Sequence, residues 1–287
     1  MAERRRSSMT MAIMMRTDTI ASRLLFTTLR IATDDGRVGT GVICSYPFSE
    51  GGEGSFLVTN KHVVTDSLHG ALTFSLADAN GQPVSDHSYK LHCREKAWQW
   101  TGHPDAEVDV AAISIKLAVD NIRRQGHNVY YCTVSRDLVL MDEQTRDMDA
   151  VEEVWMVGYP NGIYDQVNNL PVVRRGITAT PYAVDYEAKP RFLIDASVFP
   201  GSSGSPVYLY DPLGMRRRAD SGLSFGGAPR VFFLGILGSG YQRTNGGLLL
   251  AQPTNVVVSS EMLDLGIVHK ARTVIETIEH LLELEQN

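Results

Sequence analysis

The sequence predicts an all-β protein whose body has two successive halves and whose chain ends in an α-helix. Short apolar runs alternate with clusters of Gly, Pro, Asn and Asp from residue 26 onward, which is typical of the strands of sandwiches and barrels. Near the C-terminus the apolar spacing becomes helical. The expected strands are 26–31, 41–44, 55–58, 71–76 and 110–115 in the first half, and 154–158, 172–178, 192–196, 206–209, 231–237 and 248–251 in the second.

The domain boundaries follow from these patterns. Residues 1–25 are interpreted as an N-terminal extension, partly disordered or helical, and residues 26–116 as the first half. The polar segment 117–150 connects it to the second half at 151–260. Residues 261–287 predict a helix packed on the body, and a helix that binds a partner or lies on a membrane is disfavoured by its acidic polar face. The apolar residues at helical spacing are Ile267, Ala271, Val274, Ile278, Leu281 and Leu282.

Composition narrows the class of protein and its partners. A chain of 287 residues that is 43% hydrophobic and 21% charged is expected to fold rather than to be disordered. The net charge is −6 and no basic stripe is present, so nucleic acid is not expected as a partner. The short apolar run from Met9 to Met15 is too short for a signal peptide or a membrane span.

The cysteines indicate a reducing compartment. There are three, Cys44, Cys93 and Cys132, which is too few and an odd number for a disulfide-stapled secreted protein. None is in a Cys-x-x-Cys pair, and His92 beside Cys93 lacks the partner spacing of zinc sites. We therefore expect a cytoplasmic protein without a metal site or a cofactor.

A serine flanked by glycines is the strongest candidate for a catalytic nucleophile. It lies in the segment 199–206, Phe-Pro-Gly-Ser-Ser-Gly-Ser-Pro, just before an apolar predicted strand. Gly201 and Gly204 allow a tight turn around Ser203, and successive N–H groups there can point at one anion. A flexible linker is the alternative, but linkers are seldom framed by prolines and apolar strands. The Gly-x-Ser-x-Gly elbow of α/β-hydrolases is excluded because Ser205 stands at its second glycine.

His62 and Asp109 complete the groups that peptide hydrolysis by serine requires, which are a nucleophile, a base and an acid that orients the base. His62 follows the apolar run 55–58 and precedes two valines, and this context distinguishes it from the other histidines. Asp109 begins an apolar predicted strand. Taken alone, it is equally well an ordinary aspartate at the start of a strand.

Together, three motifs resemble the His, Asp and Ser motifs of the chymotrypsin-like (trypsin-fold) serine proteases, most closely the HtrA (Deg) branch. They are Thr-Asn-Lys-His-Val-Val at 59–64, Asp-Val-Ala at 109–111 and Gly-Ser-Ser-Gly-Ser-Pro at 201–206. Further matches extend the likeness over roughly Leu29 to Val258. The resemblance implies two perpendicular six-stranded β-barrels of the trypsin-like fold, with His62 and Asp109 on the first and Ser203 on the second.

The resemblance also implies the surroundings of the triad. The backbone N–H groups of Gly201 and Ser203 would form the oxyanion hole. Ser197, six positions before the nucleophile, would lie at the bottom of the primary specificity pocket. Its wall would be formed by Gly238, Ser239 and Gly240. Because no acidic residue is found among them, we expect small or medium apolar side chains to be preferred over Arg or Lys.

The sequence departs from the trypsin pattern in ways that bear on regulation. No Ile-Val-Gly-Gly-like activation sequence precedes the first half, and Ser202 rather than an aspartate precedes the nucleophile. Activation by cleavage of a zymogen is therefore not expected. Ser205 replaces a glycine of the nucleophile motif, and the residues after 258 suffice for a helix but not for a PDZ domain.

The predicted function is a serine endopeptidase that acts on protein or peptide substrates, in a bacterial cytoplasm. The alternative left open is a latent or partner-activated protease-like module that acts mainly by binding. An esterase of unrelated fold is disfavoured. A regulatory partner or a homo-oligomer is compatible with either reading of the protein.

Overall fold

The computed structural model describes residues 17–49, 51–140, 145, 148–214, 216–218, 222–224, 229–248 and 256–286. The first part of the chain contains α1 (Ile20–Leu25), β1 (Thr28–Thr33), β2 (Val38–Pro47), β3 (Glu53–Thr59), α2 (Lys61–Val64), β4 (His69–Ala77), β5 (Pro83–Arg94), β6 (Thr101–Gly102), β7 (Ala111–Ser114), α3 (Lys116–Arg124) and β8 (Val129–Tyr130). The second contains β9 (Glu153–Gly158), β10 (Val172–Thr178), β11 (Arg191–Asp195), β12 (Pro206–Asp211), β13 (Arg216–Arg218), β14 (Gly222–Ser224), β15 (Arg230–Leu248), β16 (Val256–Lys270) and α4 (Ala271–Gln286).

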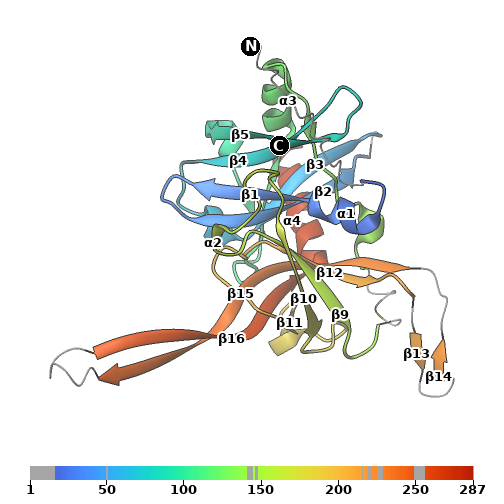
Figure 1. Ribbon diagram of the computed structural model, residues 1–287, viewed down its shortest axis with the longest axis vertical. Helices are drawn as coiled ribbons and strands as arrows, with labels where there is room; N and C mark the ends of the chain where they lie inside the picture. The colour runs from blue at the N-terminus through green and yellow to red at the C-terminus, as the bar shows by residue number, and fades with distance from the viewer. Residues whose placement is uncertain are drawn as a thin grey trace, which may run out of the picture.

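The all-β class with a C-terminal helix is confirmed (Figure 1). The second half closes into a barrel of six strands in the order β10-β11-β16-β15-β12-β9. The first half is an eight-stranded sheet in the order β5-β4-β1-β2-β3-β7-β6, with β8 paired to β4. It has more than the expected six strands because β6 and β8, of two residues each, add short pairings. No apolar run in the sequence predicts these two strands.

The helix expected over 261–287 begins ten residues later than predicted. β16 continues to Lys270, and α4 begins at Ala271. Pairing with β11 extends from Asp195↔Leu265 to Arg191↔His269, so these residues close the barrel. Ile267, counted as the first apolar residue of the helix, belongs to this strand, since barrel pairing overrides local spacing.

The connecting segment 117–150 is partly folded onto the first half. It carries most of α3, whose Ala118, Val119 and Ile122 are buried in the core of that half. These three residues are spaced so that they share one helix face, but the surrounding residues are so polar that the sequence did not predict this helix. Residues 1–16 of the expected N-terminal extension lie outside the described residues, and α1 occupies its end.

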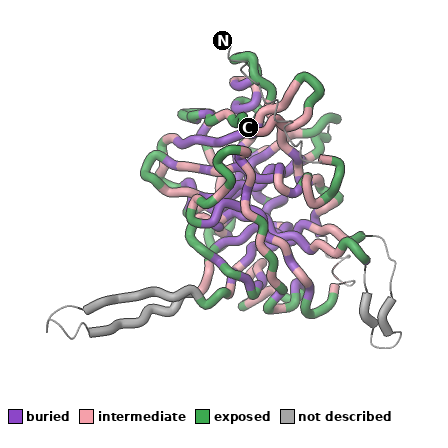
Figure 2. Tube along the Cα trace, viewed as in Figure 1, coloured by how far each residue is buried: buried purple, intermediate pink, exposed green. Residues whose placement is uncertain are grey.

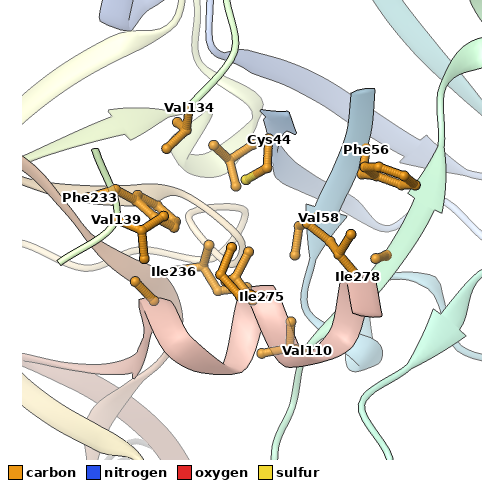
Figure 3. Packing of buried hydrophobic residues seen from close by; sticks show 14 of the residues in the cluster. Cys44, Phe56, Val58, Val110, Val134, Val139, Phe233, Ile236, Ile275 and Ile278 are labelled. Carbon is orange, nitrogen blue, oxygen red and sulfur yellow. The ribbon is translucent and has the colours of Figure 1, made fainter. Parts of the chain in front are cut away.

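The core has a separate cluster in each half and a third that joins them. Buried residues fill the centre of both halves (Figure 2). In the joining cluster, side chains of α4 pack between strands of the first and second halves (Figure 3). Its members include Val58 and Val110 from the first half, Phe233 and Ile236 from the second, and Ile275 and Ile278 from α4. The C-terminal helix therefore helps to hold the two halves in one arrangement.

Candidate active site

His62, Asp109 and Ser203 lie together, although both halves of the chain contribute to the group. His62 is in α2, Asp109 just precedes β7, and Ser203 is in the loop between β11 and β12. The Nδ1 atom of His62 is 2.6 Å from Asp109 Oδ2, and its Nε2 atom is 2.9 Å from Ser203 Oγ. The three side chains form a continuous chain of hydrogen bonds from carboxylate to hydroxyl.

The turn that carries His62 also holds the Asp109 carboxylate. The backbone N–H of His62 donates to Asp109 Oδ1 at 3.1 Å, and the buried Asn60 amide donates to the Asp109 carbonyl at 2.7 Å. Burial raises the pKa of Asp109, but the hydrogen bonds and charge of His62 outweigh this effect and hold the pKa below its ordinary value. The ionised carboxylate favours a proton on Nδ1, which leaves Nε2 able to accept one from Ser203.

The loop around Ser203 is a tight turn joined to β15. The N–H of Ser205 donates to the Ser202 carbonyl at 3.0 Å, and the N–H of Gly204 donates to the Leu237 carbonyl at 2.8 Å. Ser203 Oγ also lies 3.1 Å from the Gly238 carbonyl. The hydroxyl is therefore held between the imidazole and the edge of β15.

Two backbone N–H groups beside the hydroxyl are available to a ligand. The Pro200 carbonyl accepts from the Asn161 N–H at 2.6 Å. Since the C=O and N–H of a trans peptide point in opposite directions, the Gly201 N–H faces away from Asn161. Within the described part of the chain, no acceptor is paired with the N–H of Gly201 or Ser203, whereas that of Ser202 is paired.

Thr40 on β2 ties the first half to this loop. Its N–H donates to the Ser203 carbonyl at 2.9 Å. Its hydroxyl donates to the Gly201 carbonyl at 3.3 Å and accepts from the Tyr159 N–H at 3.0 Å. Gly204 has a φ of 82°, and a Cβ there would lie 1.9 Å from the Thr40 carbonyl. The close approach of β2 therefore requires glycine directly after Ser203.

A cavity of about 420 Å³ opens beside His62 and Ser203. Gly238, Ser239 and Gly240, the expected wall of the specificity pocket, line this cavity. Ser197 does not line it and is exposed, because its neighbours Val198 and Phe199 face the cavity instead. The remaining lining residues are Arg37, Val38, Val63, Pro200, Gly201 and Leu237.

His269 on β16 was not expected in this region. It is buried, and burial lowers its pKa to about 4, although the nearby Asp109 charge acts in the opposite direction. A Cβ at position 238 would lie 3.0 Å from the His269 ring, so the imidazole packs directly behind Gly238. A single histidine in an otherwise unremarkable strand gives no sequence signal of this placement.

The described residues contain no group of three or more His, Cys, Asp or Glu side chains that could hold a metal ion. No helix in the described parts of the chain is long and apolar enough to cross a membrane. The three cysteines are unpaired and buried.

A two-half β architecture with a Ser, His and Asp group in contact is the arrangement of a trypsin-like peptidase. Residues 39–211 match the model of the trypsin-like peptidase domain. This match covers more than half of the chain, and the protein belongs to that family. A search of curated proteins finds no significant match.

Two solved structures are similar to the chain. One is an inactive form of a serine-to-alanine mutant of Rv3671c from M. tuberculosis H37Rv, with 15% identity, a TM-score of 0.43, and coverage of 91% of this chain and 88% of that one. The other is a scabies mite inactivated protease paralogue, with 13% identity, a TM-score of 0.41, and coverage of 91% and 96%. The family assignment rests on the sequence match.

Removal of the Thr40 hydroxyl is predicted to destabilise the fold. In a Thr40→Val variant the buried Tyr159 N–H loses its acceptor and Ser205 Oγ loses its contact, so we expect a loss of about 1–3 kcal/mol in the free energy of unfolding. Thr40→Ser keeps the hydroxyl and should lose less than half of this. Denaturant unfolding measures both. Equal stability of the Val variant and the wild type would contradict the proposed network.

The buried His269 is predicted to make the stability of the fold depend on pH. The unfolded histidine binds a proton near its ordinary pKa of 6.5, whereas the folded one stays neutral until about pH 4. Stability is therefore lost as pH falls from 6.5 to 4, on the order of 3 kcal/mol in total. A His269→Gln variant should lose less stability over this range. Denaturant unfolding at each pH tests this, with the exposed His87→Gln as control. If the free energy of unfolding changed equally with pH in His269→Gln and in the wild type, the prediction would be refuted.

Proposed function

We propose that the protein is a serine endopeptidase, with Ser203 as nucleophile, His62 as general base and Asp109 as the group that orients His62. The observation that carries this proposal is the position of the His62 imidazole, 2.6 Å from the Asp109 carboxylate and 2.9 Å from the Ser203 hydroxyl. Both distances are within the range of direct proton transfer. Membership of the trypsin-like peptidase family supports the same reaction.

In the first stage, Ser203 Oγ attacks the carbonyl carbon of the substrate and its proton passes to His62 Nε2. The negative oxygen that forms is bound by the N–H groups of Gly201 and Ser203. The C–N bond then breaks as His62 gives its proton to the departing amine, which leaves an acyl group on Ser203. Asp109 stabilises the imidazolium while it carries the additional proton.

In the second stage, water attacks the acyl carbon and gives a proton to His62 Nε2. The bond to Ser203 breaks, the proton returns to Ser203 Oγ, and a carboxylic acid leaves. Each stage uses the same base and the same two N–H donors. The enzyme thus returns to its starting state with one peptide bond hydrolysed and one water consumed.

A competent rather than latent site is supported by the Pro200–Gly201 peptide. Its carbonyl is occupied by the Asn161 N–H, so its N–H is directed to the other side. A flipped peptide would put the carbonyl where the oxyanion must bind. The described conformation therefore favours catalysis over a function in binding alone.

The substrate class follows from the cavity, and we propose that it takes small or medium apolar side chains. Val198, Phe199 and Leu237 give it apolar walls, and none of the described residues that line it is acidic. A substrate Arg or Lys would lose its hydration there without gaining an ion pair. The HtrA-like branch, the cytoplasmic location and a regulatory partner stay predictions from the sequence.

The nucleophile is tested by covalent labelling. Ser203→Ala should abolish fluorophosphonate labelling and lower peptidase activity on the order of 10⁶-fold, because the reacting oxygen is removed. Ser205→Ala is the matched control and should still be labelled, since Ser205 Oγ contacts Thr40 rather than His62. A Ser203→Ala protein that cleaves casein at the wild-type rate would refute the proposal.

The specificity is tested by profiling with a peptide library. Cleavage should follow Ala, Val or similar residues, at rates about 10-fold or more above those after Arg or Lys, because burying an unpaired charge is unfavourable. The product termini are identified by mass spectrometry. Strict cleavage after Arg would show that the cavity is not the primary specificity pocket, without affecting the assignment of Ser203.

A further inference from the structure

Arg174 makes contacts that the catalytic chemistry does not explain. It lies on β10, where it pairs with Met156 of β9 in the wall of the barrel. Its Nη1 donates to the Ser197 carbonyl, and its Nη2 donates to Ser202 Oγ at 2.7 Å. Its guanidinium carbon lies 5.7 Å from the centre of the Phe199 ring. One cation thus contacts three residues of the loop that carries the nucleophile.

The environment of Arg174 is unusual for a charged side chain. It is half-buried, and burial lowers the pKa of the guanidinium. No acidic side chain in the described residues forms an ion pair with it. Its charge is met by a backbone carbonyl, a hydroxyl and an aromatic face. The next residue, Arg175, is exposed and pairs with Glu153, as a surface arginine normally does.

The loop that Arg174 contacts needs a support of this kind. Ser202 is fully buried directly before the nucleophile, and Gly201 has a φ of 81°. Ser202 has no charge, so it cannot form an ion pair with a chain terminus released by zymogen cleavage. Because glycine adopts many backbone conformations at similar free energy, the orientation of the Gly201 peptide depends on the contacts around it.

We propose that Arg174 is the positioning residue that holds the loop 197–203 in the conformation in which the N–H groups of Gly201 and Ser203 face the substrate. The inference rests on the proposed function and adds its regulation. The cation comes from a barrel strand rather than from a terminus released by proteolysis. The loop is therefore ordered as soon as the barrel folds, and the chain requires no cleavage to become active.

The contacts of Arg174 predict which part of catalysis is impaired when this side chain is removed. Arg174 touches neither His62 nor Asp109, so the base and its orientation remain. What changes is the pair of oxyanion donors, and the loss of one such donor lowers kcat about 10²- to 10³-fold. We expect Arg174→Ala to lower kcat about 10- to 100-fold, since the loop samples the right conformation part of the time. The KM should change less than about threefold.

The experiment compares Arg174→Ala with Arg175→Ala, the matched loss of one arginine from the same strand. Turnover of a peptide substrate, fluorophosphonate labelling and the melting temperature are measured for each variant. Labelling should slow in parallel with kcat only for Arg174→Ala. Millimolar ethylguanidinium should restore part of its activity by occupying the vacated site. A role limited to stability would change the melting temperature without this rescue.

Ser202 supplies a second test that does not depend on Arg174→Ala folding well. Ser202→Ala removes the hydroxyl that accepts from Nη2, and Arg174→Lys keeps the charge without the planar fork. Each should lower kcat severalfold, and together they should lower it by less than the product of their separate effects. Independent effects in this double-mutant cycle would contradict the coupling.

The outcomes separate the two proposals. If the wild type is labelled and Arg174→Ala keeps the wild-type kcat, Arg174 is not a positioning residue and the peptidase assignment stands. Reduced kcat with rescue supports both proposals. A wild type that neither cleaves peptides nor reacts with the fluorophosphonate overturns both.

Discussion

The hydrogen bond from the Thr40 N–H to the Ser203 carbonyl, 2.9 Å long, joins the two halves of the molecule at the proposed nucleophile itself. His62 and Asp109 belong to the first half and Ser203 to the second, so the Ser203 hydroxyl meets the His62 imidazole only when the halves are in register. A shift of 1 Å between them would break the contact at Nε2. The joining core cluster with α4 resists such a shift because packed interiors deform little.

The loop that carries Ser203 is supported from both sides. Thr40 holds the carbonyls of Gly201 and Ser203 from the first half, while Arg174 holds Ser202 from the second. Hydrogen-bond donors that are already oriented stabilise a developing charge without reorganising, which is why preorganised sites accelerate reactions. Side chains and backbone of β2 and β10 thus add contacts to the hydrogen bonds that the loop makes within itself, such as that from the Ser205 N–H to the Ser202 carbonyl.

Local sequence patterns predicted part of the candidate site. His62, Asp109 and Ser203 each stand in a short motif at the end or start of an apolar run, and these runs became strands. Ser197, expected at the bottom of the specificity pocket, does not line the cavity, whereas its neighbours Val198 and Phe199 do, and its carbonyl accepts from Arg174. The start of the terminal helix was also misplaced, since Ile267 satisfies helical spacing yet is recruited to the barrel.

By itself, the sequence determined the all-β class of this protein and the residues of the proposed triad: a serine between glycines, a histidine and an aspartate, each beside an apolar run. Tertiary structure alone decided which further residues lie beside them. Thr40 lies 161 positions from Gly201, and Arg174 and His269 stand in strands whose patterns resemble any other strand. Local sequence encodes backbone preference and burial, whereas contacts across the sheet and between the halves depend on how the strands close and dock.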